Sequence, residues 1–295
     1  MKMRISDSQG FATELLKELL FPARCPVCDD LIPAGRRAML LASVRRTEKE
    51  RQMLPADGNR DGSPGILCGE GSREETEILY RGLICDSCRE TFAYIREPFC
   101  RKCGKQLRQE RAEKGECLCR DCASKERLFR QCRCMISYDE TARDIMAAVK
   151  YHSRKEFLDL FAVMASDRLG AWIREFEPAF VIPVPVHVSR LRTRGYNQAG
   201  VFAEKLASLL GLRVREDVLV RRKNTAAQKE LGAEERLLNL QNAFGCAVRL
   251  SGRPAVLLVD DIYTTGSTME ACTEALLSAG AGEVFGLCIC AGEDA

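Results

Sequence analysis

The segment VLLVDDIYTTGST, residues 256–268, decides the fold of this 295-residue chain. Four apolar residues lead into two adjacent acids, Asp260 and Asp261, and then into a short turn rich in Thr, Gly and Ser. This pattern predicts a buried strand whose carboxyl end opens into a ligand crevice. The turn and the helix that follows would offer backbone N–H groups, hydroxyls and a positive dipole to an anion. Two carboxylates beside such a cradle suit a ligand that also carries a diol, namely a ribose bearing a 5′-phosphate.

The rest of the C-terminal half alternates helical and strand patterns. We expect helices over 141–151, 157–176, 197–210, 233–242 and 267–279, and strands over 180–184, 213–220, 255–259 and 283–290. Such alternation predicts a parallel sheet with helices on both faces. We therefore expect one α/β domain over residues 126–295.

The N-terminal half is rich in cysteine, since the chain has 16 Cys but only 2 His. Two Cys-x-x-Cys turns can supply the four thiolates of a closed, structural zinc site. Four such turns therefore predict two sites. Taken in order, the first is Cys25, Cys28, Cys85 and Cys88, and the second is Cys100, Cys103, Cys119 and Cys122. Spacing alone leaves open a cross-braced pairing, and also Cys117 in place of Cys119.

Residues 1–125 thus form an expected double zinc-ribbon domain, with a flexible insert near 34–80 and a short helix over 11–20. Iron–sulfur ligation is disfavoured because the dense Cys runs of ferredoxins are missing. Disulfides are disfavoured because no export signal or membrane-spanning apolar run is visible, which predicts a reducing, cytoplasmic location. Cys132 and Cys134 are interpreted as free thiols, and Cys272, Cys288 and Cys290 as core residues. A net charge of +3 does not by itself favour nucleic-acid binding.

A second polar group follows an expected strand in VIPVPVHVSRLRTRGYNQA, residues 181–199. Arg190, Arg192 and Arg194 recur there at two-residue intervals. Arginines near the end of a buried strand, together with Mg²⁺, would neutralise the charge of a departing pyrophosphate. Lys150 is either a phosphate contact or a helix C-terminal cation, and His187 either an acid–base group or a neighbour of the arginine loop.

The segment 256–268 resembles the motif by which type I phosphoribosyltransferases bind phosphoribosyl diphosphate (PRPP). That resemblance implies that Asp260 and Asp261 meet the ribose 2′- and 3′-hydroxyls. It also implies that the turn cradles the 5′-phosphate and that PRPP binds with Mg²⁺. The turn consists of Thr264, Thr265, Gly266, Ser267 and Thr268. Thr264 stands where purine-specific members often carry an acid, so the chain looks closer to orotate- or glutamine-type members.

With the Cys-x-x-Cys turns, the Arg194-Gly-Tyr-Asn-Gln run and the pattern of residues 224–239, the chain resembles the ComF family. That family joins a double zinc ribbon to a phosphoribosyltransferase domain and is associated with competence. The implied function is a glycosyltransferase moving phosphoribose from PRPP to an unknown nitrogen acceptor, linked to DNA uptake. The alternative is a non-catalytic zinc protein that binds nucleotide or single-stranded DNA, or docks DNA-uptake proteins. The insert around 34–80 is longer than the family's usual first zinc loop.

Overall fold

The computed structural model of the chain describes residues 22–32, 80, 82–222 and 243–294. It divides into two compact units, Met1–Thr91 and Phe92–Ala295. The expected helices over 11–20 and 233–242, and most of the expected insert, lie outside the described residues. The cysteines of residues 100–122 belong to the larger unit, together with the sheet. The sequence instead divides the chain after residue 125, and that boundary stays a prediction about folding domains.

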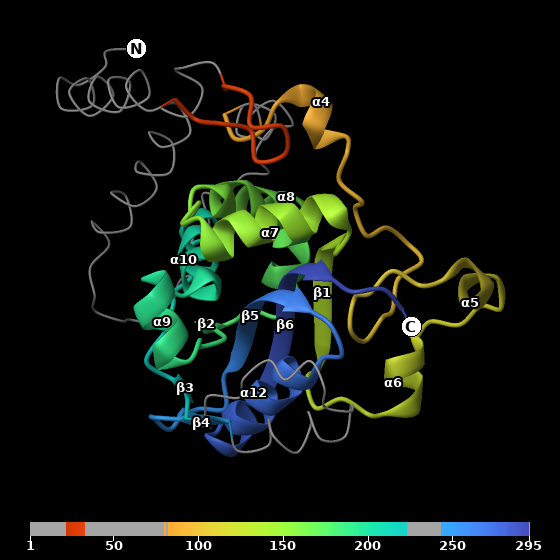
Figure 1. Cartoon of the computed structure of the whole chain (residues 1–295). Coiled ribbons are helices and arrows are strands. Elements are labelled where there is room, and N and C mark those ends of the chain that lie inside the picture. Colours follow the sequence, from red (N-terminus) through yellow and green to blue (C-terminus); the bar gives the residue numbers. More distant parts are fainter. Residues whose placement is uncertain (1–21, 33–79, 81, 223–242, 295) are drawn as a thin grey trace, which may run out of the picture. The chain divides into compact units, whose positions relative to one another are not determined.

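The larger unit is built on a four-stranded parallel sheet in the order β1-β6-β5-β2 (Figure 1). The two central strands are β5, Ala255–Tyr263, and β6, Glu283–Ala291. The two outer strands are β1, Gln131–Ser137, and β2, Phe180–Pro183. Every pair in this sheet is parallel. Because β5 and β6 are covered on both faces, their residues are almost continuously apolar, as parallel strands require.

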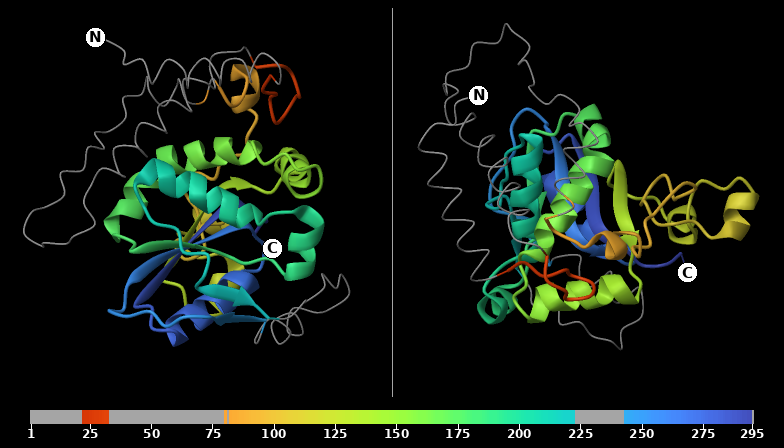
Figure 2. Two further views of the ribbon diagram at one scale, coloured as in Figure 1. Left: turned by 90° about the vertical axis from the view of Figure 1, so that its left-hand side faces the viewer. Right: turned by 90° about the horizontal axis from the view of Figure 1, so that it is seen from above.

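Helices cover both faces of the sheet (Figures 1 and 2). On one face lie α7, Glu140–Tyr151, α8, Phe157–Glu175, and α10, Gln198–Leu210. On the other face lies α12, Ser267–Ser278. The predicted α/β fold, a parallel sheet with helices on both faces, preceded by cysteine clusters, is confirmed. Among the described residues, no helix combines the length and the apolar character needed to cross a membrane.

One predicted strand differs from the structure. The strand expected over 213–220 is interrupted: Val214 makes a single bridge to Val181, a turn follows, and only residues 219–220 belong to a strand. The chain then forms β3, Leu219–Arg221, which pairs antiparallel with β4, Phe244–Cys246. The turn forms where two acids interrupt the apolar pattern, and there Arg215 donates to the Asp217 carboxylate at 2.6 and 2.7 Å.

Strand β1 was not predicted, although its side chains alternate. Gln131 and Arg133 are half-exposed, while Cys132 and Cys134 are buried between them. The alternation is that of a half-buried strand. The sequence interpretation missed it because the cysteines were considered only as thiols and ligands.

Candidate functional site

The two acids of the deciding segment lie near the carboxyl end of β5, which continues through them to Tyr263. Thr264 and Thr265 follow and are exposed. Gly266 then precedes α12 with φ +79°. A Cβ at Gly266 would lie 2.2 Å from the Tyr263 hydroxyl, so only glycine suits this sharp turn. The turn therefore delivers an exposed loop onto the N-terminus of a twelve-residue helix, where anions bind favourably.

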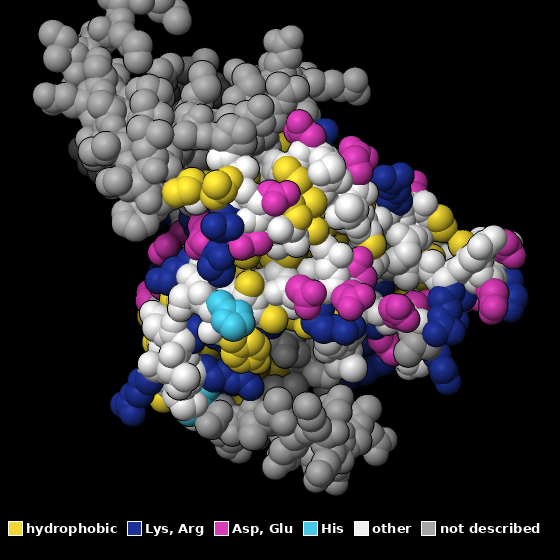
Figure 3. Space-filling view, turned by 45° about the horizontal axis from the view of Figure 1, so that its top comes forward, with side chains coloured by type: hydrophobic (Ala, Val, Ile, Leu, Met, Phe, Trp, Pro, Cys, Tyr) yellow, Lys and Arg dark blue, Asp and Glu magenta, His cyan; other side chains and the backbone are white. Residues whose placement is uncertain are grey.

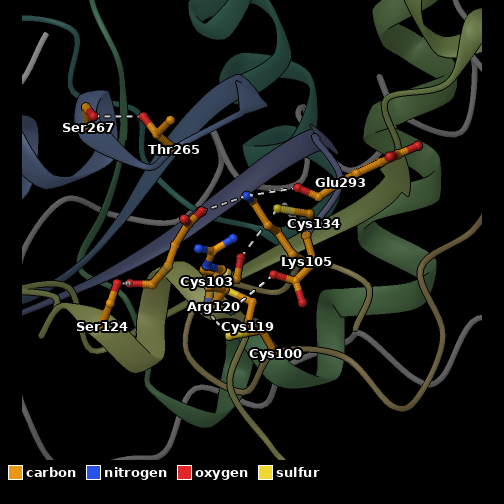
Figure 4. Close-up of polar contacts among 12 residues, drawn as sticks. Cys100, Cys103, Lys105, Cys119, Arg120, Ser124, Cys134, Thr265, Ser267 and Glu293 are labelled. Atoms are coloured by element: carbon orange, nitrogen blue, oxygen red, sulfur yellow. Dashed lines mark hydrogen bonds and ion pairs between the residues drawn. The ribbon is translucent and has the colours of Figure 1, made fainter. Parts of the chain in front are cut away.

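Hydroxyl groups line this loop. The Thr265 Oγ1 and Ser267 Oγ atoms are 2.8 Å apart and share a hydrogen bond (Figure 4). The structure thus brings the predicted residues 264–268 together as one strand–turn–helix element. An exposed turn with hydroxyls and helix N–H groups can receive a phosphate.

Asp260 and Asp261 are adjacent but lie in different surroundings. Asp261 is 7% exposed, and its carboxylate lies 2.8 Å from the Lys150 Nζ atom at the end of α7. The Gln198 Nε2 group, in the first turn of α10, donates to the same oxygen at 2.7 Å. Three elements that are distant in sequence therefore converge on one carboxylate.

These surroundings separate the pKa values of the two acids. Burial raises the pKa of Asp260 to about 8, and the neighbouring Asp261 charge adds to the effect. Burial also acts to raise the pKa of Asp261, but Lys150 outweighs it by charge and hydrogen bonding and lowers that pKa below its ordinary value. Of the two acids, Asp260 therefore holds a proton more readily than Asp261. Such a separation is typical of functional sites.

The run of residues 194–198 has a structural explanation at each position. Gly195, with φ +82°, ends the short helix α9, Val188–Arg194. The buried Tyr196 hydroxyl donates to the Val149 carbonyl oxygen, next to Lys150. Asn197 caps α10 by accepting from the Ala199 N–H group at 3.2 Å. The run therefore fixes where Gln198 starts its helix and meets Asp261.

The three predicted arginines do not share one face of α9. Arg190 and Arg194 are four residues apart and lie on the same side of a helix, whereas Arg192 is on the opposite side. Arg194 donates to the Gln198 Oε1 atom. Burial lowers the pKa of Arg221, and the positive charge of Arg190 lowers it further. Arg221 in turn acts electrostatically on Asp260. The structure thus connects Arg194 to Asp261 through Gln198, whereas Arg190 and Arg192 are both exposed.

The second group of cysteines is a closed cluster in the larger unit. The Sγ atoms of Cys100, Cys103, Cys119 and Cys122 all lie within 4.8 Å of one another, and all four residues are buried. The Cys103 and Cys119 sulfurs are 3.5 Å apart (Figure 4). Four thiolates about 2.3 Å from a tetrahedral zinc lie roughly 3.8 Å apart, so these residues fit such an ion. Cys117 is exposed and is not part of the cluster.

The first group forms a similar cluster in the smaller unit. Its members are Cys25, Cys28, Cys85 and Cys88, whose sulfurs also lie within 4.8 Å of one another. Helix α4, Asp86–Arg89, starts directly after Cys85. Cys28 is exposed and Cys85 half-exposed. The structure therefore brings the turns together in sequential pairs, and each cluster can hold one metal ion.

Two cations missed by the sequence interpretation support the second cluster and the loop. The Lys105 Nζ atom is 2.9 Å from the Asp121 carboxylate and 3.2 Å from the Glu293 carbonyl oxygen (Figure 4). Arg127, a few residues after Cys122, donates to the Thr265 carbonyl oxygen at 3.0 Å. No spacing rule signals a lone Lys or Arg whose partners are distant in sequence, so neither residue stood out.

The parallel sheet, the acids of β5 and the loop before α12 define the class: an α/β protein with a candidate phosphate site at the end of a central strand and two four-cysteine clusters. The chain is 28% identical over 218 residues to competence protein F of Haemophilus influenzae, covering 72% of this chain and 91% of that protein. It is 28% identical over 231 residues to competence protein ComFC of Bacillus subtilis, covering 73% and 89%. Its identity with the DNA utilization protein YhgH of Salmonella typhimurium is 27% over 223 residues, covering 70% and 96%. These proteins are homologues, and the resemblance to the ComF family is confirmed.

Other comparisons add little. No family model matches the chain. A purine phosphoribosyltransferase from Pyrococcus horikoshii aligns with a TM-score of 0.28 and 21% identity, covering 45% of this chain and 70% of that one. A hypoxanthine phosphoribosyltransferase from Staphylococcus aureus aligns with a TM-score of 0.26 and 14% identity, covering 45% and 62%. Likenesses this weak carry no conclusion about substrate.

Proposed function

We propose that the protein binds PRPP with Mg²⁺ at the carboxyl end of β5 and transfers its phosphoribosyl group to a nitrogen acceptor. The observation that carries the proposal is the placement of Asp260 and Asp261 directly before an exposed hydroxyl-rich turn at a helix N-terminus. In the reaction the bond from ribose C1 to the pyrophosphate oxygen breaks, and a bond from C1 to the acceptor nitrogen forms. Pyrophosphate leaves with the bonding electron pair.

The chain's own residues would divide the work as follows. Asp261, held by Lys150 and Gln198, would accept a hydrogen bond from one ribose hydroxyl. Asp260 would meet the other hydroxyl. The loop of residues 264–268 would hold the 5′-phosphate. A ribose held at both ends keeps C1 in a fixed position for attack.

The leaving group needs positive charge. Mg²⁺ bound with PRPP would supply part of it, by neutralising charge on the pyrophosphate. Arg190 and Arg194 would supply the rest from α9, and Arg192 is the weakest of the three predicted contacts because it lies on the opposite side of that helix. To do so, Arg194 would have to give up its hydrogen bond to the Gln198 Oε1 atom and donate to pyrophosphate instead.

The two four-cysteine clusters would hold structural zinc, because four thiolates close the coordination shell and leave no open position for substrate. The described cysteines are all free of disulfide bonds, which suits a reducing, cytoplasmic location. Competence and DNA utilization, named for the homologues, favour a role in DNA uptake for this chain as well.

The decisive test is calorimetric titration of the zinc-loaded protein with PRPP and Mg²⁺. Each of D260N and D261N should weaken binding by about 10- to 100-fold, the value of a hydrogen bond to a charged group. D144N, at an exposed acid on α7, is the matched control and should bind like the wild type. If wild type binds, pyrophosphate release should be screened with nitrogen acceptors. A folded wild type that does not bind PRPP would contradict the proposal.

A second candidate is non-catalytic binding of single-stranded DNA, which the homologues' names favour. Against it, basic and acidic side chains are interspersed on the face shown in Figure 3 rather than gathered into one basic surface. Oligonucleotide binding that weakens steeply with salt, in a protein that ignores PRPP, would favour this candidate.

A further inference from the structure

Three buried thiols converge within the sheet, apart from both four-cysteine clusters. Cys132 and Cys134 belong to β1, and Cys288 belongs to β6. Their Sγ atoms all lie within 4.8 Å of one another. The three residues are between 0% and 5% exposed. The sequence interpretation treated them as unrelated free thiols and core residues, whereas the fold gathers them into one group, here called the three-thiol cluster.

The strand register explains why the thiols meet. Cys134 is directly opposite Cys288, and Cys132 is opposite Gly286. Residues two apart in a strand project to the same face, so both β1 thiols lie on the side where Cys288 lies. A Cβ atom at Gly286 would be only 2.9 Å from the Cys132 Sγ atom. The missing side chain of Gly286 therefore makes the room that the Cys132 sulfur uses.

A fourth sulfur borders the same space. The Cβ position of Gly286 would lie 3.0 Å from the Met269 Sδ atom of α12. Met269 is 1% exposed. Three thiols and a thioether therefore surround one region of the core. On the other side, the Cys134 thiol donates to the Cys103 carbonyl oxygen at 3.6 Å, in the second four-cysteine cluster.

We infer that Cys132, Cys134 and Cys288 form a third metal site, one that takes a soft ion of the Cu(I) type with the Met269 thioether beside it. Thiolate and thioether ligands select Cu(I). Among the described residues, no fourth His, Cys, Asp or Glu joins the group, so it does not offer the four strong ligands of structural zinc. Thiolates about 2.3 Å from a shared ion in a trigonal site lie roughly 4 Å apart, which the observed spacing accommodates.

Charge and protons must also balance. Each thiol that coordinates releases its proton to solvent, which leaves negative charge in the core. The ammonium of Lys105, 3% exposed and also paired with the Asp121 carboxylate, acts electrostatically on Cys134. The inference does not rest on the proposed function, because Cu(I) binding is measured in the absence of PRPP.

The test is anaerobic titration of the full-length, zinc-loaded protein with Cu(I) against a chromophoric Cu(I) chelator, with copper and zinc counted by mass spectrometry. Wild type should hold one Cu(I) per chain without losing zinc, and should gain an ultraviolet thiolate-to-copper absorption band. C288A should weaken Cu(I) binding by more than about 10- to 100-fold, since changes outside the ligand shell alone reach that size. C132A removes a ligand from the other strand and should do the same.

The matched control is C290A, which removes another fully buried thiol of β6 that is not part of the three-thiol cluster. It should bind Cu(I) like the wild type. The same measurement on protein purified from copper-supplemented cells tests loading during folding. Zinc content and melting temperature identify any variant that fails to fold. Copper that enters only as zinc leaves would overturn the inference. An equal loss in C290A and C288A, or no copper in either preparation, would also overturn it.

Discussion

The two four-cysteine clusters have the same ligands and spacing within each turn but differ in their surroundings. In the first, Cys28 is exposed and Cys85 half-exposed, and the nearby Arg24–Asp29 pair is open to solvent, with side chains 45% and 64% exposed. In the second, all four cysteines are buried, and so is the supporting Lys105. The first cluster organises a small separate unit, whereas the second is part of the core that carries the sheet. The same motif therefore has a local role in one place and a domain-wide role in the other.

The largest expected effect comes from removing one ligand of each cluster. Structural zinc contributes about 10–16 kcal/mol to folding, comparable to the whole stability of a domain. C103A should therefore unfold the larger unit, with loss of its cooperative thermal transition in circular dichroism. C28A should lose one zinc and leave that transition in place. A C103A protein that melts like the wild type would contradict the difference between the clusters.

The next effect concerns the charge pairs beside the clusters. Lys105 is buried against Asp121, so K105M should lower the free energy of unfolding by about 3 kcal/mol, as when one partner of a buried pair is removed. R24M removes one partner of an exposed pair and should lower the free energy of unfolding by less than about 1 kcal/mol. Urea denaturation measures both. Equal losses in the two variants would show that burial does not distinguish the clusters.

Metal removal gives a smaller, kinetic difference. With a coloured zinc chelator in excess, the zinc of the first cluster should leave at least about tenfold faster, a barrier difference of about 1.4 kcal/mol. The reason is that the chelator can reach two cysteines of the first cluster directly. At the second cluster the surrounding core must open before the chelator can reach the zinc. C28A should lack the fast phase. Release in a single phase from wild type would argue against the difference.

The smallest expected effect concerns the connection between the second cluster and the proposed PRPP site. Arg127 connects the chain after Cys122 to the Thr265 carbonyl oxygen. R127M should weaken PRPP binding by about 3- to 10-fold, the value of one hydrogen bond, without changing zinc content. R130M, which removes an exposed pair with Glu283, is the matched control. Equal PRPP affinity in R127M and wild type would confine the second cluster to a structural role.

Much of this architecture was readable from the sequence. Helices α8, α10 and α12 and strands β2, β5 and β6 lie within a few residues of their expected positions, because each has one dominant hydrophobic pattern and a clear Gly or Pro boundary. Strand β1 was missed because buried cysteines carry its apolar face. The strand expected over 213–220 was wrong for most of its length because Glu216 and Asp217 form a turn there, and only residues 219–220 belong to β3.

The candidate site was predicted less completely than the fold. Asp260, Asp261 and the loop form one continuous motif, so the sequence identified them directly. The Lys150–Asp261 ion pair joins α7 to β5. Sequence reasoning considered Lys150 only as a phosphate contact or a helix end, because nothing local indicates which carboxylate a lysine will meet. Likewise, α9 separates Arg192 from the other two arginines, and an alternating pattern does not show this until the helix is known.

Glu293 and Asp294 help to close the second cluster. The Lys105 ammonium holds the Glu293 carbonyl oxygen, 188 residues away, and the Arg120 N–H group donates to the buried Asp294 carboxylate at 3.1 Å. At a synthesis rate of about 5–20 residues per second, these partners emerge from the ribosome roughly 10–40 seconds after the cysteines. During that interval the cysteines of residues 100–122 lack their final cover. Newly made chains therefore pass through a period in which zinc supply and oxidation compete for the same thiols.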